Sequence, residues 1–236
     1  MQNVDQFKKQ AALKAVEFVQ SGMVLGLGTG STSLYAVQEI GQRCRDGSVK
    51  SIIGIPSSIK TAHEAQQCGI PLGSLDNHPI IDLTIDGADE VDPDLNLIKG
   101  GGGALVREKI VAQNSRKVVI IIDESKLSSV LGVKRDVPIE IIPFGFRPIL
   151  NYLKALGSSV KLRKTEKGLP FETDQGNYII DCKFDRISEP QQLTGKLKEK
   201  AGIVEHGLFL GLATDVIVAG QKGIQHFSAK RKRHGI

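Results

Sequence analysis

The sequence of 236 residues contains no tryptophan, few other aromatic residues and only three cysteines. Cys44, Cys68 and Cys182 are far apart and odd in number, and none of them forms a C-x-x-C motif. This spacing argues against a disulfide framework and against a zinc site, and it fits a reducing, cytoplasmic location. The five histidines have no partners at metal-ligand spacing either, so we predict no metal.

Long apolar runs are also missing, because no stretch approaches the length that spans a membrane. The first residues do not have the pattern of a signal peptide. Apolar residues between positions 4 and 19 instead recur at helical spacing, and Ser21 and Gly22 follow them. We therefore expect an amphipathic helix at the start of the chain and no membrane partner.

A charge excess is confined to one place. The formal net charge is +5, but residues 230–233 are Lys-Arg-Lys-Arg, and without them 27 basic residues face 26 acidic ones. A short basic run of this kind can contact nucleic acid, although more often it is a solvated tail. The chain lacks the interleaved aromatic and basic residues of single-strand binders, so we predict no nucleic-acid partner.

The first half of the chain alternates short apolar runs with helical patterns, which is typical of an α/β fold. This alternation predicts a Rossmann-like parallel sheet with helices on both faces. After residue 133 shorter strands and helices surround turn signals, as in an inserted α+β domain, and apolar runs after residue 208 could rejoin the first sheet. We therefore expect a catalytic α/β domain from residues 1–132 and 208–236, and a small α+β domain from residues 133–207.

Two aspartates, a lysine and a glycine loop follow one of the expected strands closely. Residues 80–85 form an apolar run, Asp86 and Asp89 come directly after it, and Lys99 precedes four glycines at 100–103. Ligands of open parallel sheets bind beyond the carboxyl ends of the strands. The combination therefore indicates chemistry on a small molecule.

Glu108 lies in a segment with helix-forming composition, residues 104–114. Its neighbours at helical spacing are all apolar, so we expect the glutamate to lie within the buried stripe of a helix. Burial raises the pKa of a carboxyl group, which suits a general base working near neutrality. The alternative is a structural ion pair with Arg107 or Lys109.

Residues 26–32, Gly-Leu-Gly-Thr-Gly-Ser-Thr, follow the first expected strand and open a helix. Outward-pointing amides and hydroxyl groups there would bind an anion, most often phosphate. The spacing does not fit the dinucleotide pattern G-x-G-x-x-G, because Ser31 occupies the last glycine position, and no Gly-Lys-Ser/Thr of a P-loop occurs. A plain helix N-cap is the alternative. Lys8 and Lys126 are further candidates for the same anion.

In this order and with these intervals, the motifs GLGTGST, DGADEVD, KGGGGALVREK and DESK resemble the ribose-5-phosphate isomerase A family. Segments 138–144 and 202–209 are similar to that family too, so the resemblance covers almost the whole chain. The chain departs from the family pattern at Ala201, where proline is expected, at His206, where asparagine is expected, and in its ending, residues 228–236.

The resemblance implies interconversion of D-ribose 5-phosphate and D-ribulose 5-phosphate, with no metal or organic cofactor, by a homodimer or a dimer of dimers. It implies that Glu108 is the base, that Asp86 and Asp89 bind sugar hydroxyls, and that Asp86 assists ring opening. Lys99 and the amides of the glycine loop would stabilise an enediolate. The implied substrate-binding residues are Lys8, Thr29, Gly30, Ser31, Thr32, Asp86, Gly87, Ala88, Asp89, Lys99, Gly100, Gly101, Gly102 and Lys126.

Other functions occur on related architectures. Amino-sugar phosphate isomerases and acyl-CoA transferases are two of them, and sugar-phosphate sensors of transcriptional regulators are a third. A transferase would use a glutamate as nucleophile, and the sequence has no separate CoA signature. A sensor would need a DNA-binding helix pair, whereas the first residues lead directly into the helix of the domain itself.

Overall fold

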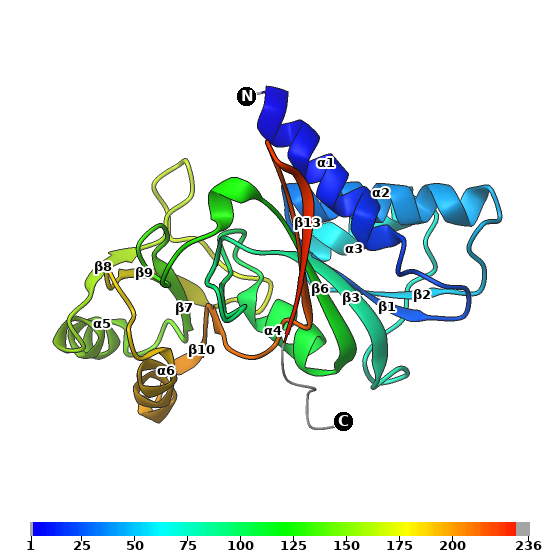
Figure 1. Cartoon of the computed structure of the whole chain (residues 1–236). Helices are drawn as coiled ribbons and strands as arrows, with labels where there is room; N and C mark the ends of the chain where they lie inside the picture. The colour runs from blue at the N-terminus through cyan, green and yellow to red at the C-terminus, as the bar shows by residue number, and fades with distance from the viewer. Residues whose placement is uncertain (1, 230–236) are drawn as a thin grey trace. The chain divides into compact units, whose positions relative to one another are not determined.

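The computed structural model describes residues 2–229, which form two compact units (Figure 1). Unit 1 comprises Met1–Ala88, Arg107–Lys126 and Gly211–Ile236, and unit 2 comprises Asp89–Val106 and Leu127–Leu210. The basic run at residues 230–233, for which nucleic acid was considered, lies outside the described residues.

Unit 1 is built on a six-stranded sheet with the order β13-β12-β6-β3-β1-β2. Its neighbouring strands are parallel except at one edge, where β13 is antiparallel to β12. The expected parallel sheet is therefore confirmed, with one antiparallel edge strand added. The strands are β1 (Val24–Leu27), β2 (Ile53–Pro56), β3 (Ile81–Gly87), β6 (Ser115–Asp123), β12 (Asp215–Gly220) and β13 (Gly223–Ser228).

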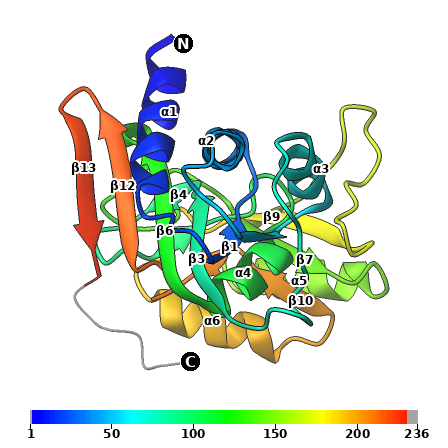
Figure 2. The ribbon, with the colours of Figure 1, turned by 90° about the vertical axis from the view of Figure 1, so that its right-hand side faces the viewer.

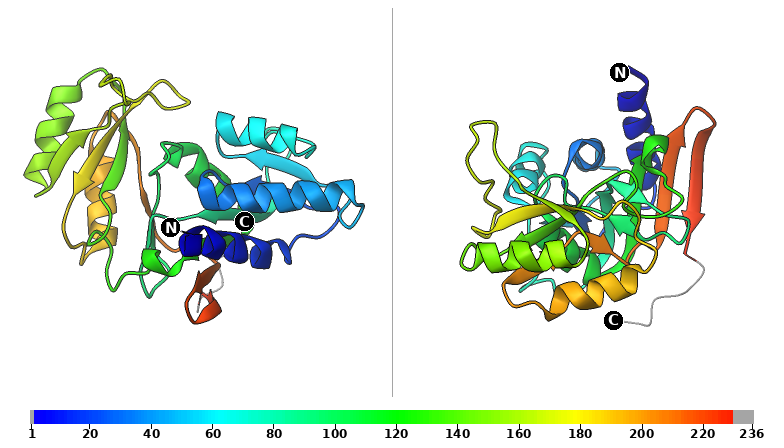
Figure 3. Two further views of the ribbon diagram at one scale, coloured as in Figure 1. Left: turned by 90° about the horizontal axis from the view of Figure 1, so that it is seen from above. Right: turned by 90° about the vertical axis from the view of Figure 1, so that its left-hand side faces the viewer.

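Helices cover both faces of this sheet, as the alternation of patterns predicted (Figure 2). The helices of one face are α1 (Gln2–Val16), α2 (Ser31–Arg45) and α3 (Ile59–Gln67), and α4 (Leu105–Gln113) covers the other. Leu25 and Leu27 pack in one core cluster with residues of α1 and α2, which lie side by side (Figure 3). Gly26, between them, faces Val111 of α4. None of the helices within residues 2–229 has the length and apolar character needed to cross a membrane.

Unit 2 contains a four-stranded antiparallel sheet with the order β10-β7-β9-β8. Ile139 and Ile180 are paired in register, and both belong to one core cluster with Leu153 and Leu197 of the two helices of this unit. The elements are β7 (Val137–Ile141), α5 (Phe146–Ala155), β8 (Ser159–Leu162), β9 (Tyr178–Lys183), α6 (Pro190–Glu199) and β10 (Ile203–His206).

A small three-stranded sheet also belongs to unit 2. It consists of β4 (Glu90–Val91), β5 (Leu97–Ile98) and β11 (Leu208–Phe209), and β5 lies in the middle. The sequence analysis assigned residues 89–106 to the first domain and expected residues 208–213 to rejoin the first sheet. In the structure, β11 pairs with β5 instead of joining the first sheet. Residues 89–106 therefore belong to unit 2, and so do residues 208–210.

Candidate active site

Three predicted segments of unit 1 lie at one edge of its sheet. β3 lies between β1 and β6, and the three strands are parallel, so their carboxyl ends meet at the same edge. The loop at residues 26–32, here named the phosphate loop, follows β1, Asp86 lies near the end of β3, and the short helix η1 (Glu124–Lys126) follows β6.

The carboxylate of Asp86 is fixed against the phosphate loop. Its Oδ1 accepts hydrogen bonds from Thr29 N at 3.1 Å, Ser33 Oγ at 3.1 Å and Gly87 N at 2.7 Å. A Cβ at Gly28 would lie 2.2 Å from the same oxygen, so only glycine allows this approach. Asp86 is 3 % exposed, and it joins the end of β3 to the start of α2.

Ser33 was not singled out in the sequence, although it follows the predicted loop directly. The hydroxyl group of Thr29 has neighbours that were also not foreseen. Its Oγ1 lies 2.8 Å from Ser57 Oγ, 2.9 Å from Ser58 Oγ and 3.0 Å from Thr61 Oγ1. Ser58 caps α3 by accepting a hydrogen bond from Thr61 N. The side chain of Thr29 therefore connects the phosphate loop to α3, in addition to its predicted role.

Lys8 lies next to the phosphate loop, as the sequence analysis expected. Its Nζ donates to Ser31 Oγ at 3.0 Å, across 23 residues of sequence. α2 begins at Ser31, and its N-cap Gly30 has φ +121°, a conformation that favours glycine. A lysine ammonium beside a helix N-terminus suits an anion. Thr32 lies in the first turn of α2, and Lys126 ends η1 with a half-buried side chain.

The predicted burial of Glu108 is confirmed. Glu108 lies in α4 and is 5 % exposed, and its helical neighbours Leu105, Val111 and Ala112 are buried too. Lys109 is also buried, at 4 % exposure. Glu108 therefore lies within the buried stripe of α4, as its helical spacing predicted.

Gly87 and Ala88 end the first segment of unit 1, and unit 2 holds Asp89 and residues 99–102. Lys99 is the first of the latter. Its backbone N–H donates to Gly207 O at 2.9 Å, and its Nζ lies 5.5 Å from the ring centroid of Phe209. A Cβ at Gly207 would lie 2.3 Å from Lys99 O, so the backbone segments at these two residues are in close contact. Lys99 is 3 % exposed, and its backbone is held firmly against the segment that follows His206.

Residues 99–103, here named the glycine loop, are held by Asp89. Gly101 N donates to Asp89 Oδ2 at 2.8 Å. The resemblance implied that this amide stabilises the enediolate, whereas in this structure it donates to a carboxylate. Arg163 also contacts the loop, and the sequence analysis missed it because it lies 62 residues after Gly101 in a different segment.

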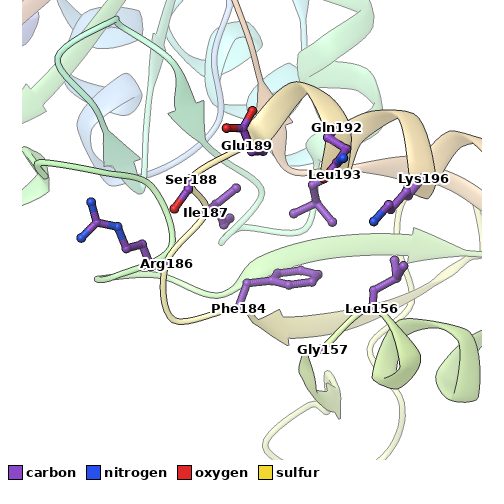
Figure 4. A pocket seen from close by; sticks show the side chains of 10 residues that line it. All are labelled: Leu156, Gly157, Phe184, Arg186, Ile187, Ser188, Glu189, Gln192, Leu193 and Lys196. Atoms are coloured by element: carbon purple, nitrogen blue, oxygen red, sulfur yellow. The ribbon is translucent and has the colours of Figure 1, made fainter.

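The described part of the chain contains no group of three or more His, Cys, Asp or Glu residues that could hold a metal ion. A pocket of about 220 Å³ lies in unit 2 between the first turns of α6 and residues 184–188 (Figure 4). Its lining includes Arg186, Gln192 and Lys196 but none of the predicted site residues.

Comparison with known proteins identifies the family. The family model described as ribose 5-phosphate isomerase A (phosphoriboisomerase A) matches residues 53–223. A ribose-5-phosphate isomerase A of Chloroflexus aurantiacus is 53 % identical over 219 residues, which cover 93 % of this chain and 92 % of that protein. The chain belongs to the ribose 5-phosphate isomerase A family. The family relative from Desulfatibacillum aliphaticivorans is 50 % identical and covers 97 % of this chain and 100 % of its own length.

Solved structures of ribose 5-phosphate isomerases have the same fold. One of them, in complex with phospho-erythronic acid, is 40 % identical, has a TM-score of 0.94 and covers 96 % of this chain and 99 % of its own. The enzyme from Plasmodium falciparum is 43 % identical with a TM-score of 0.93, covering 96 % of this chain and 100 % of its own. The family resemblance that the four motifs indicated is confirmed.

Proposed function

We propose that this ribose 5-phosphate isomerase interconverts D-ribose 5-phosphate and D-ribulose 5-phosphate with Glu108 as the base. One observation supports the assignment of the base most directly: Glu108 is a buried carboxyl group on the apolar side of α4. The C2 proton of the open-chain aldose is α to the C1 carbonyl and is only weakly acidic. A positioned base is therefore needed to remove it at neutral pH.

The reaction moves one proton from C2 to C1 and one from O2 to O1. Glu108 takes the proton from C2, the electrons of that bond form the C1–C2 double bond, and the carbonyl oxygen O1 becomes negative. A proton then passes between O2 and O1, which Asp86 assists, and Glu108 returns its proton to C1. The ketose at C2 results, and the enzyme is unchanged. Asp86 and Asp89 bind the sugar hydroxyls, and Asp86 also assists ring opening.

Negative charge on O1 and O2 is the main cost of this route. Lys99 and the backbone amides of Gly100, Gly101 and Gly102 stabilise that charge, because preorganised donors lower the energy of a developing oxyanion. The adjacent residues Gly87 and Ala88 complete the sugar site.

The phosphate group of the substrate is held by the phosphate loop. The close approach of Lys8 Nζ to Ser31 Oγ, at 3.0 Å, supports this assignment, because both lie at the N-terminus of α2. The residues proposed to hold the phosphate are Lys8, Thr29, Gly30, Ser31, Thr32 and Lys126.

We infer a cytoplasmic location and a homodimer, or a dimer of dimers. Free cysteines support the first inference, since Cys44, Cys68 and Cys182 form no disulfide in the structure. Light scattering of the purified protein over a range of concentrations would measure the oligomeric state, and a constant monomer mass would contradict the second inference.

The decisive experiment measures ketose formation from D-ribose 5-phosphate in the presence of a metal chelator. We expect rapid conversion by the native protein and a loss of about 10²–10⁴-fold in Glu108→Gln, which keeps the shape of the side chain but cannot accept the proton. Glu17→Gln is the matched control, because Glu17 is exposed and pairs only with Lys14.

Each outcome has a separate meaning. Conversion that survives in folded Glu108→Gln would keep the activity and move the base to Asp86 or Asp89. Conversion that the chelator abolishes would contradict the proposal that no metal takes part. No conversion by the folded native protein would contradict the proposed activity itself.

A further inference from the structure

One side chain, Arg163, holds the glycine loop from a distant part of the sequence. Arg163 follows β8, and its Nη1 donates to Gly100 O at 2.8 Å and to Gly101 O at 3.2 Å. Arg163 and the loop both belong to unit 2, and the side chain of Arg163 is only 16 % exposed. Two successive peptide carbonyls therefore point toward a single, largely desolvated guanidinium group.

The direction of these carbonyls determines the direction of two amides. No cis peptide bond occurs among residues 2–229, and in a trans peptide the N–H points opposite to the C=O. The N–H groups of Gly101 and Gly102 therefore point away from Arg163. The N–H of Gly101 meets the carboxylate of Asp89 on that side, at 2.8 Å.

The orientation of Arg163 is itself fixed by two contacts. Its Nε donates to Asp181 Oδ2 at 3.0 Å and its Nη2 donates to Asp181 Oδ1, so the ion pair is bidentate. Its Cζ lies 5.9 Å from the ring centroid of Phe171. A bidentate pair fixes the plane of a guanidinium, which a lysine ammonium with one nitrogen cannot reproduce.

The four glycines of the loop, residues 100–103, have no side chains with which to hold these peptide planes. Glycine populates a wide range of backbone conformations, so four in succession have little preference for one. The last of them, Gly103, is confined by Phe171, whose Cε1 would lie 2.5 Å from an added Cβ. The backbone of Lys99 is held by Gly207, at the other end. Between these ends the peptide planes are held by Arg163, by Asp89 and by a hydrogen bond from Gly103 N to Gly100 O at 3.0 Å.

We propose that Arg163 is a positioning residue for the isomerisation. It orients two successive peptide planes so that the N–H groups of Gly101 and Gly102 point away from the guanidinium, toward the negative oxygen of the enediolate. The N–H of Gly101, which donates to Asp89 Oδ2 in this structure, would exchange that partner for the enediolate oxygen. This inference rests on the proposed function of the glycine loop in stabilising that oxygen. Without the guanidinium both carbonyls lose Arg163, although Gly100 O retains the hydrogen bond from Gly103 N. The peptide planes are then held less firmly, and the amides are less well preorganised for the oxyanion.

Steady-state kinetics would test this with Arg163→Ala, Arg163→Lys and Asp181→Asn beside the native enzyme. Lys183→Ala is the matched control, because Lys183 lies on the same strand as Asp181 but forms an exposed ion pair with Asp185. Inhibition by phospho-erythronic acid, whose carboxylate resembles the enediolate oxygens, and by inorganic phosphate would be measured for every variant. Circular dichroism would give the folded fraction.

We expect kcat of Arg163→Ala to fall about 10–100-fold, as is usual when a partner that orients a catalytic group is removed. KM and inhibition by phosphate should change little, whereas the inhibition constant of phospho-erythronic acid should rise by a factor similar to the loss of kcat. For Arg163→Lys and Asp181→Asn, kcat and the inhibition constant of phospho-erythronic acid should lie between the values of Arg163→Ala and those of the native enzyme. The control should match the native enzyme.

Native kcat and native affinity for phospho-erythronic acid in folded Arg163→Ala would overturn the proposal. Losses that follow only the folded fraction, or that weaken phosphate equally, would also overturn it, because they indicate a structural role. If Arg163→Ala does not fold, Asp181→Asn decides by the same measurements. The proposed function fails separately, through absent turnover in the native protein.

Discussion

The phosphate loop and the glycine loop are both rich in glycine, yet they are held in different ways. The phosphate loop connects β1 directly to α2, whose first residues belong to the loop. The glycine loop follows a strand of only two residues, and Arg163, Phe171 and Gly207 hold it from segments that come much later in the chain. The first loop continues directly into a regular helix, in addition to its contacts with Asp86, Ser57 and Ser58, whereas the second loop depends on packing by later segments.

This difference suggests a difference in task. A phosphate group keeps its charge throughout the reaction, so a helix N-terminus and a lysine are sufficient to bind it. An enediolate exists only briefly, and its stabilisation requires donors whose directions are fixed beforehand. Substitutions at the phosphate site should therefore weaken substrate affinity, and substitutions in the glycine loop should lower turnover.

Lys99→Ala tests the second half of this comparison and should have the largest effect. We expect kcat to fall about 10²–10³-fold with KM changed much less, because the ammonium acts on charge that develops during the reaction. Kinetics with D-ribose 5-phosphate would measure both constants. Lys200→Ala is the control, since Lys200 Nζ lies over the ring of Tyr152 at the same 5.5 Å that separates Lys99 from Phe209. Full activity of Lys99→Ala would remove Lys99 from the mechanism.

Lys8→Ala tests the first half and should have a smaller effect. We expect KM to rise about 10-fold while kcat remains near the native value, because a charge-assisted hydrogen bond to an exposed ligand contributes about 1.5 kcal/mol. Lys9→Ala is the matched control. It also removes one positive charge from α1, but Lys9 is exposed, and the contact to Ser31 is made by Lys8. A fall in kcat without a change in KM would break the proposed division of tasks.

Asp215→Asn should have the smallest effect, on stability alone. Burial raises the pKa of Asp215, but hydrogen bonds from Thr214, His226 and Ser228 and the charge of Lys117 outweigh it and lower the pKa. A lowered pKa contributes stability above the unfolded value, which is lost as the pH falls through the folded one. We expect the Tm of the variant to be about 2–4 °C below native at pH 7.

The difference in Tm should shrink as the pH falls from about 4, near the unfolded pKa, through the lower pKa of the folded state, because protonation of Asp215 then removes the charge that its partners stabilise. Thermal melts at pH 7 and pH 3 would measure it. KM should remain native, because the partners of Asp215 lie outside the phosphate loop. A weaker substrate affinity in Asp215→Asn would contradict that part of the comparison.

What could be predicted from the sequence follows the same division. Burial of Glu108 and the position of Asp86 came from patterns within a few residues, and the structure confirms both. The sheet formed by β4, β5 and β11 could not be foreseen, because strands of two residues have no periodicity. Arg163 could not be found either, since nothing near it in the sequence distinguishes it from the other arginines.

Asp86 also has a consequence for how this chain can change over generations. Its carboxylate fills the space above Gly28, so any other amino acid there would place carbon where the oxygen lies. Gly195, on α6, has an ordinary helical backbone and open space around it, and alanine there would favour the helix by about 1 kcal/mol. Position 195 can therefore accept other amino acids, whereas position 28 cannot. A substitution of Gly28 would also displace the carboxylate of Asp86.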